Sequence, residues 1–139
     1  MAADDEPRKT KPLVWVGSSL RDLRRFPKAV RTVFGQALFD AQRGDKHPDA
    51  KPLRGFRGAG VLEVVESDEG NAFRAVYTVR FAELVYVLHA FQKKSKSGIK
   101  TPVEDMAKIR NRLKDAEAHY ARWKEQQHEE DDRNSSGTQ

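Results

Sequence analysis

The sequence predicts an α+β domain in which helices pack on one antiparallel sheet. Two segments with helical spacing near the N-terminus precede three short segments rich in Val, Phe and Tyr. Only short, turn-forming sequences separate those three segments, which favours an antiparallel meander. A long segment with helical spacing follows them. The expected order of elements is therefore β-α-α-β-β-β-α.

The N-terminal part is expected to hold one strand and two helices. LVWVG (13–17) is a short apolar run that ends at a glycine, which is typical of a strand. The serine pair 18–19 is suited to cap the helix that follows. Pro27 ends that helix and begins a second, whose apolar residues fit one helical face as far as Gly44. We expect the two helices to form a hairpin that lies on the sheet.

The remainder is expected to contain a loop, a three-stranded meander and a long helix. Residues 45–60 contain two prolines and three glycines, which predicts a loop. The three strands are expected at about 61–67, 72–81 and 84–92. Thr-Pro-Val-Glu at 101–104 is typical of a helix start. Apolar residues at steps of three and four then extend the helix to about residue 127.

The 139 residues favour one domain, expected at 12–127, between a disordered arm at 1–11 and a disordered acidic tail at 128–139. No apolar stretch approaches the roughly 20 residues of a membrane span. The N-terminus lacks the apolar segment of a signal peptide. We therefore expect a cytoplasmic protein with no membrane partner. The chain has no cysteine, so disulfides and thiolate metal sites are excluded.

The charge of the expected domain is strongly positive. Residues 12–127 hold 22 of the 26 basic residues and 14 of the 21 acidic ones, whereas the whole chain carries only +5. Such a body suggests a polyanionic partner, nucleic acid first or an acidic protein, although a solvated basic surface is equally compatible. The four histidines form no metal-binding spacing, and no phosphate-binding glycine motif is present. We expect no metal and no cofactor.

Basic residues are the candidates for function, and they lie around the sheet. The candidates are Arg54, Arg57, Arg74, Arg80, Lys93, Lys94, Lys96 and Lys100. Arg74 and Arg80 are an even number of residues apart on one strand, so they face the same side. The strand that starts at 72 and the strand that ends at 92 meet at one end of the meander, which makes Arg74 and Lys93 neighbours. Arg54, Arg57 and Arg80 are expected toward the other end unless the long loop folds back.

Several of these side chains have two interpretations. Arg74 could clamp a phosphate, or pair with Glu63 or Glu66 across the hairpin. His89 could act in acid–base chemistry, but it alternates with apolar residues, which favours a hydrogen-bonded core histidine. If Ala82-Glu83 is a tight turn, Arg74 lies opposite Phe91 and His89 shares the Arg74 face instead. Phe91 could stack on a base or cap the core.

An ordered set of motifs resembles a known family. F-R-A-V-Y-T-V is followed by V-Y-V-L-H-A-F-Q-K-K-S-K, then T-P, then a helix that carries R-L-K-D. Together with L-R-G at 53–55 and the helical hairpin, this pattern is similar to the RelE/HigB toxins of bacterial toxin–antitoxin pairs. It is most similar to the subgroup of phage-derived host-killing proteins. The resemblance covers roughly 13–120.

The resemblance implies a RelE-like fold and a metal-independent endoribonuclease that cuts mRNA, usually on the ribosome, and is silenced by an antitoxin. It implies that Arg74 matches the strand arginine of the family, and that Lys93 and Lys94 match its basic residues after the last strand. Such chemistry needs charge stabilisation at the phosphorane and proton transfer to and from the ribose oxygens. Crowded lysines can depress one another's pKa, which suits one of them to proton transfer.

One departure from the family pattern leaves a second interpretation open. Members of the subgroup commonly have E-L-R where this chain has Glu63-Val64-Val65, so Val65 stands in the place of an arginine. Either Arg54 or Arg57 substitutes for it, or the chain is a non-catalytic basic module that binds RNA or protein. A DNA-binding repressor is a weaker alternative, because no helix-turn-helix signature is present.

Overall fold

The computed structural model describes residues 9–56, 58–93 and 101–136, and it confirms the α+β class. The N-terminal elements are β1 (Leu13–Trp15), α1 (Ser19–Arg24) and α2 (Lys28–Gln42). The remaining elements are β2 (Lys51–Pro52), β3 (Val61–Asp68), β4 (Asn71–Thr78), β5 (Val85–Lys93) and α3 (Val103–Ser136). The predicted order is therefore correct, with β2 as one short strand that the sequence did not predict.

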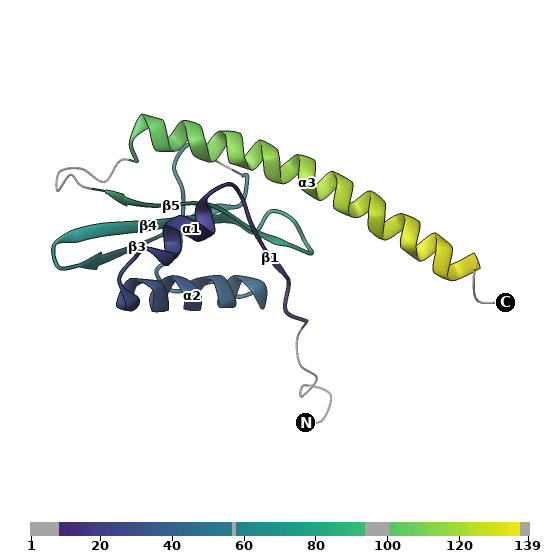
Figure 1. Cartoon of the computed structure of the whole chain (residues 1–139), viewed down its shortest axis with the longest axis horizontal. Coiled ribbons are helices and arrows are strands. Elements are labelled where there is room, and N and C mark those ends of the chain that lie inside the picture. The colour runs from purple at the N-terminus through teal and green to yellow at the C-terminus, as the bar shows by residue number, and fades with distance from the viewer. Residues whose placement is uncertain (1–8, 57, 94–100, 137–139) are drawn as a thin grey trace, which may run out of the picture.

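The sheet is the predicted meander with one strand added at each edge. Its order is β1-β5-β4-β3-β2, and every neighbouring pair is antiparallel except β1 and β5, which are parallel. Helices cover both faces: α1 and α2 lie on one and α3 lies on the other (Figure 1). We call these the α2 face and the α3 face of the sheet.

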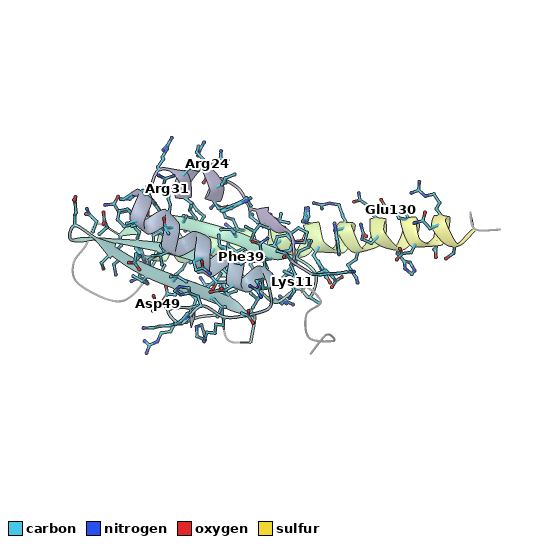
Figure 2. The ribbon with its side chains drawn as sticks, turned by 90° about the horizontal axis from the view of Figure 1, so that it is seen from below. Lys11, Arg24, Arg31, Phe39, Asp49 and Glu130 are labelled. Carbon is cyan, nitrogen blue, oxygen red and sulfur yellow. The ribbon has the colours of Figure 1, made fainter. Side chains whose placement is uncertain are left out.

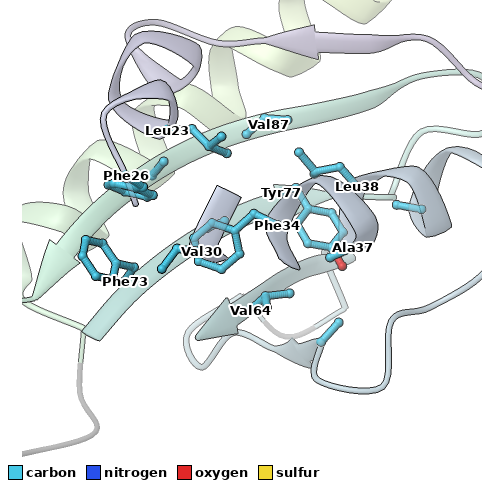
Figure 3. Packing of buried hydrophobic residues seen from close by; sticks show 14 of the residues in the cluster. Leu23, Phe26, Val30, Phe34, Ala37, Leu38, Val64, Phe73, Tyr77 and Val87 are labelled. Carbon is cyan, nitrogen blue, oxygen red and sulfur yellow. The ribbon is translucent and has the colours of Figure 1, made fainter. Parts of the chain in front are cut away.

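The core on the α2 face is built mainly from apolar contacts between the helical hairpin and the sheet, with one buried hydrogen bond from Ser19 Oγ to the Val87 carbonyl, at 3.1 Å. Leu23, Phe26, Val30 and Phe34 of the hairpin point toward Phe73, Tyr77 and Val87 of the strands (Figure 3). The rings of Phe26 and Phe73 lie 4.9 Å apart, and those of Phe26 and Phe34 lie 6.0 Å apart. These tilted and edge-on pairs are favourable arrangements for aromatic side chains. They fix the turn between α1 and α2 on the first residues of β4.

The helical hairpin has the predicted boundaries, but its caps differ from the prediction. Ser18 occupies the N-cap position of α1 without a side-chain capping bond, and its hydroxyl donates to Asp22 instead, at 2.7 Å. Pro27 is the residue that precedes α2, where its fixed φ of −55° leads the chain into the helix. Proline therefore separates the two helices, as the sequence predicts.

The core on the α3 face is smaller and ends well before α3 does. Ile109, Leu113 and Ala116 are its buried helical residues, with Tyr120 and Trp123 partly buried behind them. Helix α3 nevertheless continues to Ser136 and projects beyond the sheet (Figure 1). The prediction that the helix ends near residue 127 and that a disordered tail follows is therefore wrong as far as Ser136. No helix in the described part of the chain is both long and apolar enough to cross a membrane.

Candidate functional site

A β-bulge in β5 determines which side chains face α3. Val76 of β4 pairs with His89, whereas the next residue, Tyr77, pairs with Val87, so Leu88 is an additional residue in β5. Leu88 belongs to the core on the α3 face while Val87 and Ala90 belong to the core on the α2 face. The simple alternation of β5 is therefore interrupted. Beyond the bulge, His89, Phe91 and Lys93 lie on the α3 face.

The bulge brings Arg74 and the end of β5 together. Arg74 pairs directly with Phe91, as predicted, and Ala72 pairs with Lys93. The expected tight turn at Ala82-Glu83 is wrong, because β4 ends at Thr78 and β5 begins at Val85, and the bulge produces this register instead. Arg74 and Lys93 are therefore diagonal neighbours on one face, a placement in which Cα atoms lie about 7–8 Å apart. The predicted proximity of these two residues is borne out by the register.

Arg74 is a buried cation with protein partners. Its side chain is 4% exposed, and Nη1 donates to Glu63 Oε2 at 3.1 Å and to Thr101 Oγ1 at 3.3 Å. The predicted ion pair with Glu63 across the hairpin is therefore present. A buried guanidinium requires such partners, because desolvating an unpaired charge is costly. Glu63 and Thr101 thus hold the guanidinium of Arg74 in one position.

A pocket of about 510 Å³ adjoins Arg74 on the α3 face. Its wall contains both partners of Arg74, together with residues from β2, from the following loop and from the first turn of α3. The lining residues are Lys51, Pro52, Leu53, Arg54, Gly55, Glu63, Thr101 and Met106. The pocket thus combines apolar walls with two cations and one carboxylate. Its volume lies within the usual range for ligand sites, about 300–1,000 Å³.

The long loop folds back over the sheet, and this brings Arg54 to the pocket. A Cβ atom added to Gly55, whose φ is +92°, would lie 3.0 Å from Met106 Cε, so the loop is in close contact with α3. The guanidinium of Arg110 also lies over the ring of Phe56, at 5.5 Å. Arg54 therefore does not lie toward the other end of the sheet, because the long loop folds back, which is the second of the two expectations. Arg57 lies outside the described residues.

His89 is held in the interior by two partners on α3. Its side chain is 4% exposed, with Nε2 2.7 Å from Asp105 Oδ1 and Nδ1 3.3 Å from Arg112 Nη1. Its ring stacks on Phe91 at 4.6 Å. Burial lowers the pKa of His89 from its ordinary value, while Asp105 acts in the opposite direction. The structural role favoured by the sequence is borne out by these contacts, although the histidine is on the Arg74 face and not among Val85 and Val87.

Arg112 connects α3 to the other side of the domain. Nη1 donates to the Leu88 carbonyl at the bulge, at 2.9 Å, and Nη2 donates to Ser18 Oγ at 2.9 Å. Burial lowers the pKa of Arg112, and Asp22 and Asp115 act against that shift. Arg112 therefore ties the bulged part of β5 to the start of α1 and fixes the depth of α3 on the sheet.

The remaining candidates are not part of the pocket. Arg80 forms an exposed ion pair with Glu117, at 2.8 Å, about 16 Å along the helix axis from Met106. It lies at the other end of the sheet, as expected. Phe91 is buried and stacked on His89, so in this structure it caps the core. Lys94, Lys96 and Lys100 lie outside the described residues.

Val65, which stands where the family pattern has an arginine, faces the same region. It pairs directly with Arg74 across the hairpin and is 39% exposed. An arginine here would therefore extend beside Arg74, at the surface. Arg54 is not on β3; it lines the pocket from the loop that follows β2.

Three contributors to the site were not identified from the sequence. Lys51 enters the pocket because β2 pairs it with Glu63, but a strand of two residues gives no periodic signal. Thr101 was interpreted as a helix-start residue, yet it also binds Arg74, and Asp105, which received no role from the sequence, binds His89. Among the described residues, no group of three His, Asp or Glu side chains could hold a metal ion.

Comparison with known proteins gives one family and several distant structural likenesses. A mutant of the Escherichia coli toxin RelE in the free state is 19% identical, with a TM-score of 0.44 over 58% of this chain and 81% of its own. The toxin–antitoxin complex RelBE2 from Mycobacterium tuberculosis is 18% identical, with a TM-score of 0.43 over 60% of this chain and 99% of its own.

Among curated proteins the comparison finds no match. The family model described as phage derived protein Gp49-like (DUF891) matches residues 21–114, which contain the hairpin, β3 to β5 and the first part of α3. This match bears out the similarity to the phage-derived subgroup that the sequence motifs indicate. The chain belongs to the family of phage-derived Gp49-like proteins.

Proposed function

We propose that this chain is the toxin of a type II toxin–antitoxin system and cleaves mRNA without a metal ion. One observation carries the proposal: on the α3 face, Arg74 and Lys93 are neighbours beside a pocket that Arg54 also lines. Membership of the phage-derived family and the motif similarity to RelE/HigB toxins support it. Cytoplasmic location follows from the proposed substrate.

The proposed reaction is attack of the ribose 2′-hydroxyl on the adjacent phosphate. Arg74 would stabilise the charge on the phosphorane, because a guanidinium donates two parallel hydrogen bonds to phosphate oxygens. Lys93 and Lys94 would transfer protons to or from the ribose oxygens. Arg54 and Lys51, which line the pocket, would bind neighbouring phosphates, and the apolar wall at Pro52 and Met106 would contact a base.

For the substrate phosphate to bind, Arg74 must exchange one of its present hydrogen-bond partners. Its guanidinium now donates to a carboxylate and a hydroxyl, and it is buried. A phosphate has the same charge sign as Glu63 and accepts the same hydrogen bonds, so it would replace one of these partners. Thr101 is the partner that would move most easily, because its bond to Arg74 is the longer one and it lies outside the sheet.

An antitoxin would silence the toxin by covering the same cationic residues. Acidic side chains would compete with RNA for Arg54, Lys51 and Lys93, and apolar ones would fill the wall of the pocket. The proposal is tested by inducing this gene alone and together with the adjacent gene. We expect growth to stop in the first case only, and vigorous growth in both cases would contradict the toxin function.

Purified protein and a matched pair of variants test the site. The chain should cleave RNA in the presence of EDTA, and Arg74→Ala should abolish the cleavage. Arg80→Ala removes an exposed arginine at the other end of the same sheet and serves as the control, so it should cleave normally. If Arg74→Ala is as active as the parent chain, the assignment of Arg74 is wrong.

A second candidate function is a non-catalytic RNA-binding module. The specific observation in its favour is Val65, which leaves the position directly opposite Arg74 without the arginine of the family pattern. Such a module would bind RNA without cutting it, in both the presence and the absence of EDTA. Binding without cleavage would therefore favour this function over the toxin.

A further inference from the structure

The turn between α1 and α2 carries a dense group of cations that the pocket does not include. Residues 21–31 contain five basic residues and one acidic residue. Their apolar residues, Leu23, Phe26 and Val30, are buried in the core on the α2 face, so the basic side chains are left at the surface. We call this the basic turn, formed by Arg21, Arg24, Arg25, Lys28 and Arg31.

Few of these charges are neutralised inside the protein. Arg21 lies 4.0 Å from Asp22, and Arg31 Nε donates to the Phe26 carbonyl, at 3.0 Å. Within the described part of the chain, Arg24, Arg25 and Lys28 have no carboxylate within ion-pair distance. A group of unpaired guanidinium and ammonium groups is electrostatically suited to a polyanion.

The position of Lys28 and Arg31 is unfavourable for α2. The first turn of this helix holds both cations and no acidic residue. Cations at a helix N-terminus oppose the helix macrodipole, whereas Arg21 and Arg24, in the last turn of α1, agree with it. The like charges of the basic turn also repel one another. Stability of α2 therefore does not explain why Lys28 and Arg31 are here.

The basic turn and Arg74 lie at the same end of the sheet, on opposite faces. Phe26 in the turn packs on Phe73, and Phe73 is the residue immediately before Arg74 in β4. Consecutive strand residues face opposite sides, so the two cationic regions are separated only by the end of the sheet. Figure 2 shows Arg24 and Arg31 at one edge of the molecule, with Glu130 of α3 toward the opposite end.

We propose that the basic turn is a second phosphate-binding surface for the RNA whose reacting nucleotide lies in the pocket. The RNA backbone would leave the pocket beside Arg74, pass around the end of the sheet and contact Arg24, Arg25 and Lys28. This inference rests on the proposed function for the identity of the polyanion. It adds that the chain prefers RNA longer than the pocket can hold.

The charge of α3 supports this orientation of the RNA. Residues 124–136 contain five acidic residues and two basic ones, and they project away from the sheet. An approaching polyanion is repelled by that end and attracted by the end that carries the basic turn and Arg74. The asymmetry therefore directs RNA to the proposed path.

The test measures how RNA affinity depends on the length of the RNA and on the charge of the basic turn. Full 2′-O-methyl RNAs of about six and about 18 nucleotides cannot be cleaved through the 2′-oxygen and serve as binding probes, the longer one exceeding a typical single site. One variant carries Arg24→Gln, Arg25→Gln and Lys28→Gln. The matched control carries Lys114→Gln, Arg122→Gln and Arg133→Gln, which removes the same charge from exposed positions on α3.

We expect the turn variant to bind the long RNA about 10-fold or more weakly and the short RNA unchanged, with the control within about 2-fold of the parent chain. The salt dependence of long-RNA binding, log K against log salt, should become shallower by about 2. Equal weakening in both variants, or unchanged long-RNA binding, would overturn the proposal.

The same proteins separate this inference from the proposed function. Cleavage of an unmodified short RNA tests the site alone, and the turn variant should cleave it like the parent. If the parent binds long RNA through the turn but cleaves nothing, the catalytic proposal fails and the second surface stands. If the parent cleaves short RNA but gains no affinity with length, only the second surface fails.

Discussion

The two faces of the sheet are built by different means, although the same three strands form both. On the α2 face, the helical hairpin packs on the sheet almost entirely through apolar side chains. On the α3 face, a smaller apolar core is joined by buried polar pairs, Arg74 with Glu63 and His89 with Asp105. Buried ion pairs contribute little net stability, because desolvation offsets the attraction. The α2 face therefore stabilises the fold, and the α3 face holds charged side chains in place.

The largest expected effect is on the α2 face. Phe34 is fully buried, so Phe34→Ala should lower the free energy of unfolding by about 3–5 kcal/mol, through lost transfer energy and the cavity left behind. Urea unfolding followed by circular dichroism measures this. Phe39 is on the same helix but 44% exposed, so Phe39→Ala should cost about 1 kcal/mol or less. Similar losses in the two variants would contradict the burial of Phe34 in the core on the α2 face.

Removing one member of a buried pair on the α3 face should have the next largest effect. Arg74→Ala removes the cationic partner of Glu63, and we expect a loss of about 2–3 kcal/mol in the free energy of unfolding. RNA cleavage should fall by about 100-fold or more. The double variant Arg74→Met/Glu63→Leu removes both charges and should recover most of the stability but none of the activity. Recovery of activity in the double variant would show that Arg74 is structural.

Val65→Arg tests whether the α3 face lacks one cation for efficient function. The side chain is partly exposed, so stability should change by about 0.5 kcal/mol or less. A new charge-assisted bond to phosphate should strengthen RNA binding by about 10-fold. Leu62→Arg is on the same strand but on the α2 face, so it should destabilise the protein without improving binding. If Val65→Arg leaves binding unchanged, the position opposite Arg74 is not in contact with RNA.

The pH dependence of stability should also differ between the faces. Burial lowers the pKa of His89 in the folded state, so the unfolded chain takes up the proton at higher pH. The contribution of neutral His89 is fully present above its ordinary value of 6.5 and is lost as the pH falls. Unfolding free energies measured from pH 7.5 downward should decline less steeply in His89→Gln. His128→Gln, on the exposed part of α3, should decline like the parent chain.

Much of the fold could be predicted from the sequence because the elements have simple local signals. The meander follows from the short connections between consecutive strands. The helical hairpin follows from an apolar face interrupted by Pro27. These features depend on neighbouring residues, which a sequence pattern records directly.

The site was less predictable because it depends on contacts between distant segments. Arg54 reaches the pocket only because Gly55 and Phe56 pack on α3. The face of His89 depends on the bulge at Leu88, and Val-Leu-His-Ala-Phe has no residue that marks a bulge. Helix α3 continues beyond its last partly buried apolar residue, because Glu, Gln, Lys and Arg favour a helical backbone even without packing.

The smallest expected effect is at the far end of α3. The described residues that a truncation after Lys124 removes are exposed or half-exposed, so the free energy of unfolding should change by about 1 kcal/mol or less. Helical content should fall in circular dichroism while the urea midpoint stays almost the same. A large fall in the midpoint would show that the projecting segment contributes to the α3 face.

Beyond the bulge at Leu88, the regular alternation of β5 makes the candidate site sensitive to the length of this strand. Deleting Leu88 itself would only remove the bulge and leave His89, Phe91 and Lys93 on the α3 face, whereas deleting Ala90 would turn Phe91 and Lys93 toward the α2 face. If the chain is a toxin, selection for survival in its host would therefore have a route to inactivation that needs no change in any charged residue. Loss of a single codon for an apolar residue in the interior of a strand would be enough.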